Sequence, residues 1–153
     1  AYLGPLCHRI ISKAAEEGLF SDSFCKSFKA LDVINTIQMS NFIEEGKESI
    51  LDDCVKDNAQ DSEILAQLID SHIKRSACLA AINLASVIIK ADAGKTKPVL
   101  INADGSTYYK TEGLRNYTEK YLHEFLAKKG LKAVFTQIEN SPTIGAAIGG
   151  LCL

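Results

Sequence analysis

The sequence has no block of charge of one sign and no long apolar run. Its 17 basic and 19 acidic residues are interspersed and leave a net charge of −2. Neither nucleic acid nor an anionic membrane surface is therefore predicted as a partner. No apolar run approaches the roughly 18 residues that span a membrane, and the first residues do not predict a signal peptide.

Cysteine and histidine are present without the spacing of a disulfide framework or a metal site. The cysteines are odd in number, lie far apart and form no Cys-x-x-Cys pair; they are Cys7, Cys25, Cys54, Cys78 and Cys152. This pattern predicts reduced, mostly buried thiols in a cytoplasmic protein. The histidines, His8, His72 and His123, have no second ligand at helical spacing, so no metal site is predicted.

The length of 153 residues corresponds to about one domain and suffices to bury a core. Apolar residues make up 46% and charged residues 24%, which is typical of globular proteins. The chain opens with Ala1 instead of methionine and enters a helical pattern at once. We therefore expect residues 1–153 to be a single segment of a longer protein.

Apolar residues recur at three- and four-residue intervals through most of the chain, which predicts a helix-rich fold. The predicted helices cover residues 1–17, 23–30, 36–45, 48–57, 62–91, 114–129 and 143–153. Asn35 or Thr36 is predicted to cap the third of them. The helix over residues 62–91 is apolar on nearly every side toward its end, so we expect that end to be buried in the middle of the domain.

Two β-rich segments, residues 99–103 and 131–138, are the predicted strands. A helix separates them, and this order predicts a right-handed parallel crossover. Because two strands do not make a stable sheet alone, we expect a partner or a missing part of the chain to supply more. The predicted fold class is α/β, helix-rich with a few strands.

The first predicted strand ends at Asp104-Gly105-Ser106, the most informative turn of the chain. We expect a short polar hairpin here, followed by a helix. The order strand, glycine turn, helix is how nucleotide-binding domains present a ligand edge. Gly105 lets backbone approach a ligand, and Ser106 offers a hydroxyl donor and acceptor. The alternative is an ordinary hairpin in which Gly105 only supplies a positive φ angle.

Seven short segments, one of which contains this turn, together indicate a protein family. They are Tyr2-Leu3-Gly4, Glu17-Gly18-Leu19-Phe20, residues 36–40 with Ile43-Glu44, Arg75-Ser76-Ala77, residues 101–108, Leu122-His123-Glu124 and Gly145-Ala146-Ala147. In this order and approximate spacing they resemble the C-terminal part of the large lobe of eukaryotic-type hexokinases. The Asp-Gly-Ser-x-Tyr element at residues 104–108 is the most specific of them.

The resemblance implies a partial actin-like, ribonuclease-H-like lobe and, for the whole protein, ATP-dependent phosphorylation of glucose or a related hexose. It places Asp104, Gly105 and Ser106 at the adenosine and Thr36 and Ser40 near the nucleotide. The family's catalytic aspartate, sugar-binding residues and both Gly-Thr phosphate loops lie upstream of the Tyr-Leu-Gly helix. The resemblance therefore implies that Mg²⁺ and the hexose bind mainly outside this segment. It also implies that the segment has no catalytic or metal-binding residue and is inactive alone.

The chain departs from the family pattern at two places. Pro5 stands where the family has a glutamate, and residues 139–143 lack the glycines of the family's last loop. Two other interpretations are a lobe of another actin-like or sugar-kinase superfamily ATPase and a non-catalytic helical regulatory module. For Thr36 and Ser40 the alternative is an N-cap and a solvated helix residue. The sequence carries no signal of the oligomeric state.

Overall fold

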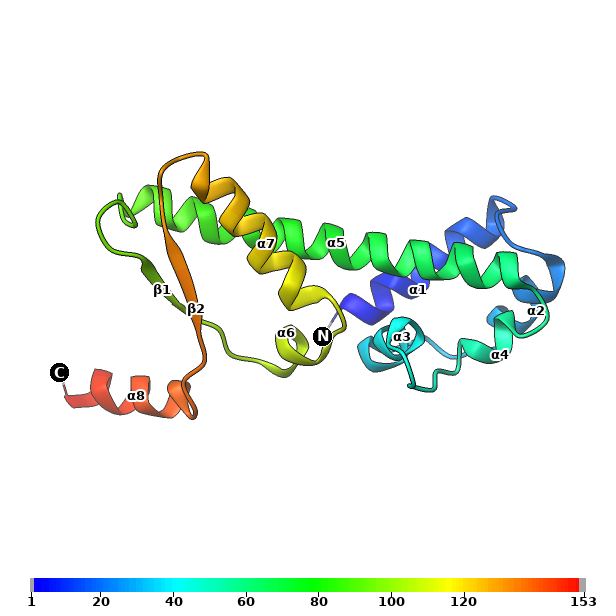
Figure 1. Ribbon diagram of the computed structural model, residues 1–153. Helices are drawn as coiled ribbons and strands as arrows, with labels where there is room; N and C mark the ends of the chain where they lie inside the picture. The colour runs from blue at the N-terminus through cyan, green and yellow to red at the C-terminus, as the bar shows by residue number, and fades with distance from the viewer. Residues whose placement is uncertain (1, 152–153) are drawn as a thin grey trace.

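The computed structural model describes residues 2–151, and most of its elements lie along one long helix, whereas the last helix lies apart from it (Figure 1). The helices are α1 (Leu3–Glu16), α2 (Asp22–Lys29), α3 (Thr36–Ile43), α4 (Asp52–Val55), α5 (Ala59–Lys90), α6 (Ser106–Lys110), α7 (Leu114–Ala127) and α8 (Ser141–Leu151), and the strands are β1 (Val99–Asn102) and β2 (Ala133–Thr136). Helices α1 to α4 lie around the first half of α5, whereas α7 and the strands lie beside its second half. The fold is helix-rich with a small parallel sheet, as predicted.

Asparagine side chains begin α3 and α5, where the sequence holds its cap signals. The Asn35 side-chain oxygen accepts from the Gln38 amide at 3.0 Å, and that of Asn58 accepts from the Gln60 amide at 3.0 Å. Each bond satisfies an amide that has no partner within the helix. Asn35 is therefore the N-cap of α3, and Thr36 is the first helical residue.

Helix α4 is much shorter than the predicted helix over residues 48–57. The Ser49 hydroxyl donates to the Gln38 carbonyl oxygen at 2.8 Å, and the Ile50 amide donates to the Gln38 side chain at 2.9 Å. The Ser49 amide donates to the Asp52 carboxylate at 2.7 Å. These bonds satisfy the backbone in a non-helical form, so the helix begins only at Asp52.

The main apolar core lies where α1 to α4 pack against the first half of α5. Its fully buried side chains include Ile11 of α1, Phe24 of α2, Met39 of α3, Leu51 beside α4 and Ile69 of α5. Burial of one such side chain contributes about 1.5–3 kcal/mol relative to exposure. This core fixes how α1 and α3 sit against α5.

Helix α1 crosses the beginning of α3 at very short range. A Cβ atom on Gly4 would lie 2.7 Å from the Asn35 Cα, and closer still to the Asn35 carbonyl carbon and the Thr36 nitrogen. The Gly4 amide donates to the Thr36 hydroxyl at 3.3 Å. The glycine of the Tyr-Leu-Gly element therefore lets two backbones meet and fixes the start of α3.

A second, smaller core joins the second half of α5 to α7 and the strands. Its buried members are Ala81, Ala85, Ile88, Leu122, Leu126 and Ala133. The prediction that this half of α5 is buried on nearly every side is wrong, because Leu79 is 49% exposed and Val87 is 67% exposed. Among residues 2–151 only α7 and the sheet pack on this half, so one face is buried and the other is open.

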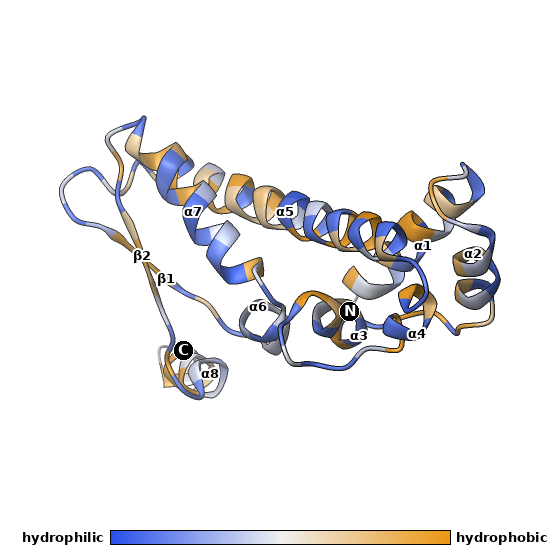
Figure 2. Cartoon of the chain, turned by 45° about the vertical axis from the view of Figure 1, so that its right-hand side comes forward, coloured by the Kyte–Doolittle hydropathy of each residue, from blue (hydrophilic) through white to orange (hydrophobic). Residues whose placement is uncertain are grey.

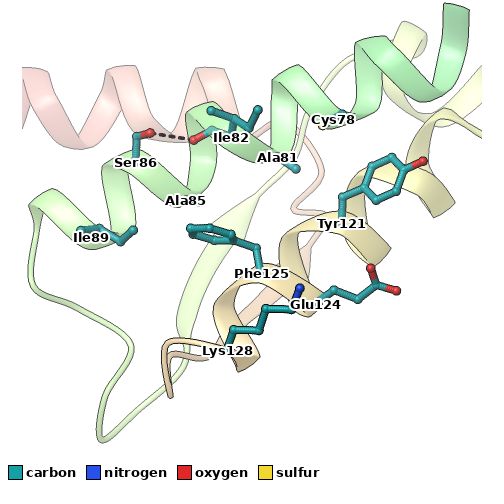
Figure 3. Close-up of a pocket in the computed structure, with 10 residues that line it drawn as sticks. All are labelled: Cys78, Ala81, Ile82, Ala85, Ser86, Ile89, Tyr121, Glu124, Phe125 and Lys128. Carbon is teal, nitrogen blue, oxygen red and sulfur yellow. Dashed lines mark hydrogen bonds between the residues drawn. The ribbon is translucent and has the colours of Figure 1, made fainter.

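Part of the exposed apolar surface gathers in a groove of about 330 Å³ between α5 and α7 (Figure 3). Ile82 and Ile89 of α5 and Phe125 of α7 line it. The small side chains of Ala81 and Ala85 leave this space open. The groove is thus formed by the alternation of large and small side chains on α5.

By length and composition alone, helix α5 is long and apolar enough to span a membrane. This finding contradicts the expectation that no apolar segment of the chain reaches that length. Of the most apolar 18-residue stretch of α5, 33% is buried. The core helix of a globular protein meets the same criterion, so the observation is weak by itself. The buried side of α5 packs on α1, α3 and α7.

Strands β1 and β2 pair in parallel, as predicted, with Val99 opposite Ala133 and Asn102 opposite Thr136. Within the described residues the sheet has two strands, and further strands from a partner or a missing part of the chain stay a prediction. Leu100, on the face turned away from the core, is 72% exposed. Helix α8 follows β2 and is apolar, yet it has no buried residue along its described length (Figure 2).

His72 of α5 holds the start of α1 and is almost completely buried. Its Nε2 lies 3.0 Å from the Leu3 carbonyl oxygen, which can only accept, so Nε2 carries the proton. Its Nδ1 is buried without a hydrogen-bond partner among the described residues. Burial lowers the pKa of His72 below its ordinary value; the hydrogen bond to Leu3 offsets part of this shift, and the nearby Arg75 adds to it.

We expect the free energy of unfolding to fall as the pH drops below 6.5, the ordinary pKa of His72. Unfolding exposes this side chain and lets it bind a proton that the folded state disfavours. The stabilisation is complete above that pH and is lost as the pH falls toward the lowered folded-state pKa. Urea unfolding at about pH 7.5 and about pH 5.5 measures the change. In His72→Gln the change should shrink; an equal change in both proteins would contradict the assignment.

Candidate functional site

The turn at Asp104, Gly105 and Ser106 leaves the carboxyl end of β1 and is exposed at all three residues. Gly105 has φ 121° and ψ 135°, a conformation that residues with a Cβ rarely adopt. A Cβ placed on Gly105 would meet nothing within 4 Å. The turn therefore needs glycine for its backbone shape, and it leaves bare backbone open to approach from one side.

The residues after the turn form the short helix α6 and not the predicted hairpin. A hairpin requires an antiparallel return strand, whereas β1 pairs in parallel with β2. The chain therefore leaves the sheet at Asp104 instead of doubling back. The observed order is strand, glycine turn, helix, and the alternative of an ordinary hairpin is wrong.

Two hydrogen bonds from β2 and the residues after it hold the strand side of the turn. The Ala103 amide donates to the Thr136 carbonyl oxygen at 3.0 Å. The Asn102 side-chain oxygen accepts from the Ile138 amide at 3.1 Å. The parallel sheet thus fixes the point at which the turn begins.

Thr36 and Ser40 are one helical turn apart on α3, as their spacing predicts. Both hydroxyls accept from backbone amides of distant segments, Thr36 from Gly4 at 3.3 Å and Ser40 from Glu112 at 2.7 Å. Ser40 is only 2% exposed, so it is not the solvated helix residue of the alternative interpretation. In this structure the two hydroxyls connect α3 to α1 and to the segment after α6.

A cleft of about 390 Å³ separates α3 from the end of α6. Its volume lies within the range of small-molecule sites, about 300–1,000 Å³. The cleft is lined by Ile37, Asn41, Glu44, Lys47, Tyr109, Lys110, Thr111 and Glu112. None of the five predicted nucleotide residues, all of which are described, is among them.

The cleft residues Asn41 and Tyr109 were not singled out from the sequence, although each lies next to a residue that was. Ile37 and Asn41 follow Thr36 and Ser40 by one position, so they form the adjacent stripe of the same helix. Tyr109 directly follows the Asp-Gly-Ser-x-Tyr element. Helical periodicity predicted α3 but not which of its stripes would line a cleft.

The next features are the possible metal ligands and the cysteine thiols in the described part of the chain. No group of three or more His, Cys, Asp or Glu side chains within residues 2–151 is arranged to hold a metal ion. Cys7 and Cys54 are buried, Cys25 is half-buried and Cys78 is exposed, and all four are free. Burial raises the pKa of Cys7 to about 12, so this thiol stays protonated. Cys152 lies outside the described residues.

Comparison with known families agrees with the resemblance drawn from the sequence. A family model described as Hexokinase matches residues 1–152, nearly the whole chain. The chain therefore belongs to the hexokinase family and is part of a kinase-type transferase. This family depends on ATP and Mg²⁺ and is generally cytoplasmic. A comparison with curated proteins finds no match.

Proposed function

We propose that residues 1–153 are the C-terminal part of the large lobe of a hexokinase and form the adenosine side of its ATP site. The whole protein then transfers a phosphoryl group from ATP to glucose or a related hexose in the cytoplasm. Family membership supports the enzyme class. The turn at Asp104, Gly105 and Ser106 supports the location of the site.

The observation that carries the proposal is the open backbone at Gly105. The turn stands at the carboxyl end of a parallel strand, the end at which open α/β sheets bind ligands. Space within 4 Å of a Cβ position on Gly105 is free, so a nucleoside can approach the main chain there. The Ser106 hydroxyl adds a donor and an acceptor, and Asp104 shapes the turn.

Neither Thr36 nor Ser40 lines the cleft between α3 and α6, so their proposed role near the nucleotide is to hold the surrounding elements in place. The hydrogen bond from the Glu112 amide to Ser40 links the two sides of this cleft. The bond from the Gly4 amide to Thr36 fixes the first turn of α3. In this proposal the two hydroxyls hold α3 in place, Thr36 against α1 and Ser40 against the segment after α6.

The resemblance assigns the nucleoside end of ATP to this segment and the phosphates to residues outside it. Phosphoryl transfer requires Mg²⁺, amides that grip the phosphates and a group that accepts the sugar hydroxyl proton. ATP supplies the phosphoryl group when bound, and the proposal assigns Mg²⁺ and the hexose mainly to residues outside this segment.

Photolabelling of the full-length protein with an azido-adenine analogue of ATP tests the location of the site. After digestion, the label is expected in the peptides that contain α3, the Asp104-Gly105-Ser106 turn and α6. Excess ATP should prevent this labelling, and the α2 peptide serves as the unlabelled control. Specific label confined to peptides other than the three expected ones would contradict the proposal.

The isolated segment of residues 1–153 should show no kinase activity. The resemblance places the phosphate loops, the sugar-binding residues and the catalytic aspartate outside it, and these are the groups that phosphoryl transfer requires. A coupled assay with glucose and MgATP should give no hexose phosphate above the background rate, with the full-length protein as positive control. Hexose phosphorylation by the segment alone would sink this expectation.

A further inference from the structure

Helix α6 is held in place by something other than a buried core. It spans only residues 106–110 and has no buried residue. Its N-cap, Gly105, has no side chain with which to cap it. Two consecutive tyrosines, Tyr108 and Tyr109, extend from this helix to different partners, and these contacts attach it to the rest of the molecule.

The Tyr109 hydroxyl reaches back across the turn. It donates to the Ala103 carbonyl oxygen at 3.1 Å, and Ala103 is the residue directly before Asp104. The Ala103 amide in turn donates to the Thr136 carbonyl oxygen at 3.0 Å. Ala103 is thus held by the sheet through its nitrogen and by α6 through its oxygen.

The two tyrosines are connected through an ion pair on α7. The Arg115 guanidinium lies 5.6 Å from the centroid of the Tyr109 ring, and its Nε donates to the Glu119 carboxylate at 2.7 Å. The same carboxylate oxygen accepts from the Tyr108 hydroxyl at 3.2 Å. The Tyr108 ring also stacks on Phe135 of β2 with centroids 6.0 Å apart. We refer to Tyr108, Tyr109, Arg115 and Glu119 as the tyrosine brace.

We propose that Tyr109 is a positioning residue that holds the Asp104-Gly105-Ser106 turn in its ligand-binding shape. The brace fixes both ends of the turn, because Tyr109 joins α6 to Ala103 while Tyr108 joins α6 to α7 and β2. A glycine turn has many accessible backbone conformations, so holding its ends removes freedom that a ligand would otherwise have to remove. The part of this inference that concerns the nucleotide rests on the proposed function; the part that concerns the brace does not.

Tyr109→Phe in the full-length protein tests the inference. Phenylalanine keeps the ring that lines the cleft and lies beside Arg115, and removes only the hydroxyl that bonds to Ala103. Tyr117→Phe is the matched control, because it also removes one tyrosine hydroxyl bond, to Asp70 at 2.8 Å, but on α7 where it faces α5. Two readouts are needed: steady-state kinetics, and hydrogen exchange of residues 104–111 without nucleotide.

The expected result for Tyr109→Phe is faster exchange over residues 104–111 and a rise of about five-fold in the ATP Michaelis constant, with kcat nearly unchanged. Tyr117→Phe should change neither quantity. Unchanged exchange in Tyr109→Phe would overturn the positioning role whatever the kinetics show. Faster exchange with an unchanged ATP Michaelis constant would support the brace and overturn the proposed place of the adenosine at this turn, so the two failures are distinguishable.

Discussion

Replacing Gly4 by alanine is expected to lower the free energy of unfolding by about 1–3 kcal/mol. The added methyl group would lie 2.7 Å from the Asn35 Cα and nearer still to adjoining backbone atoms. Backbone does not swing aside as the end of a long side chain does, so α1 or α3 must shift. The shift would break the bond from the Gly4 amide to Thr36. Urea unfolding of the full-length protein measures the loss.

Gly145 provides the matched control, because it is also a helical glycine and a Cβ on it would meet nothing within 4 Å. Gly145→Ala should be neutral or should stabilise the protein by up to about 1 kcal/mol, since alanine favours the helix. A Gly4→Ala protein as stable as the wild type would show that α1 and α3 do not cross at this distance. An equal loss in both variants would attribute the effect to alanine itself.

The elements of this fold follow largely from local sequence. Apolar periodicity predicts the long helix α5, and asparagine caps set the first residues of α3 and α5. The two short strands and their parallel pairing follow from β-rich segments separated by a helix. The helices, caps and strands depend on neighbouring residues, which is why a single sequence suffices to predict them. The parallel pairing joins distant residues, and it follows instead from the handedness of a strand–helix–strand connection.

The details of the candidate site depend on contacts between distant segments, and the sequence did not predict them. Ser40 is buried where its hydroxyl accepts from the Glu112 amide, 72 positions away. The shortening of α4 arises from bonds between Ser49 and Gln38 of α3. The exposed face of α5 reflects how few elements cover its second half. The Asp-Gly dipeptide favours a hairpin locally, but the parallel pairing of β1 overrides that preference.

Replacing Gly105 by valine should impair ATP use more than any other property of the protein. A β-branched residue at φ 121° is strained by about 1–3 kcal/mol, and its side chain would fill the space through which a nucleoside approaches. We therefore expect the ATP Michaelis constant to rise by about ten-fold or more. The Michaelis constant for the hexose should stay within about two-fold of the wild type, because the proposal assigns the hexose to residues outside this segment.

Gly18→Val controls for the strain of such a substitution. Gly18 also has a positive φ angle, 79°, and a Cβ on it would meet nothing within 4 Å, but it lies in the turn after α1. Both variants should therefore lose a similar part of their stability. Thermal unfolding checks that both remain folded under the conditions of the kinetic assay.

The most direct test of the proposed adenosine site is the ATP Michaelis constant of the full-length protein at saturating hexose. It is compared among the wild type, Gly105→Val and Gly18→Val. If residues 104–106 form it, only Gly105→Val shows the rise of about ten-fold or more. A folded and active Gly105→Val protein with an unchanged constant would contradict this, as would an equal rise in Gly18→Val.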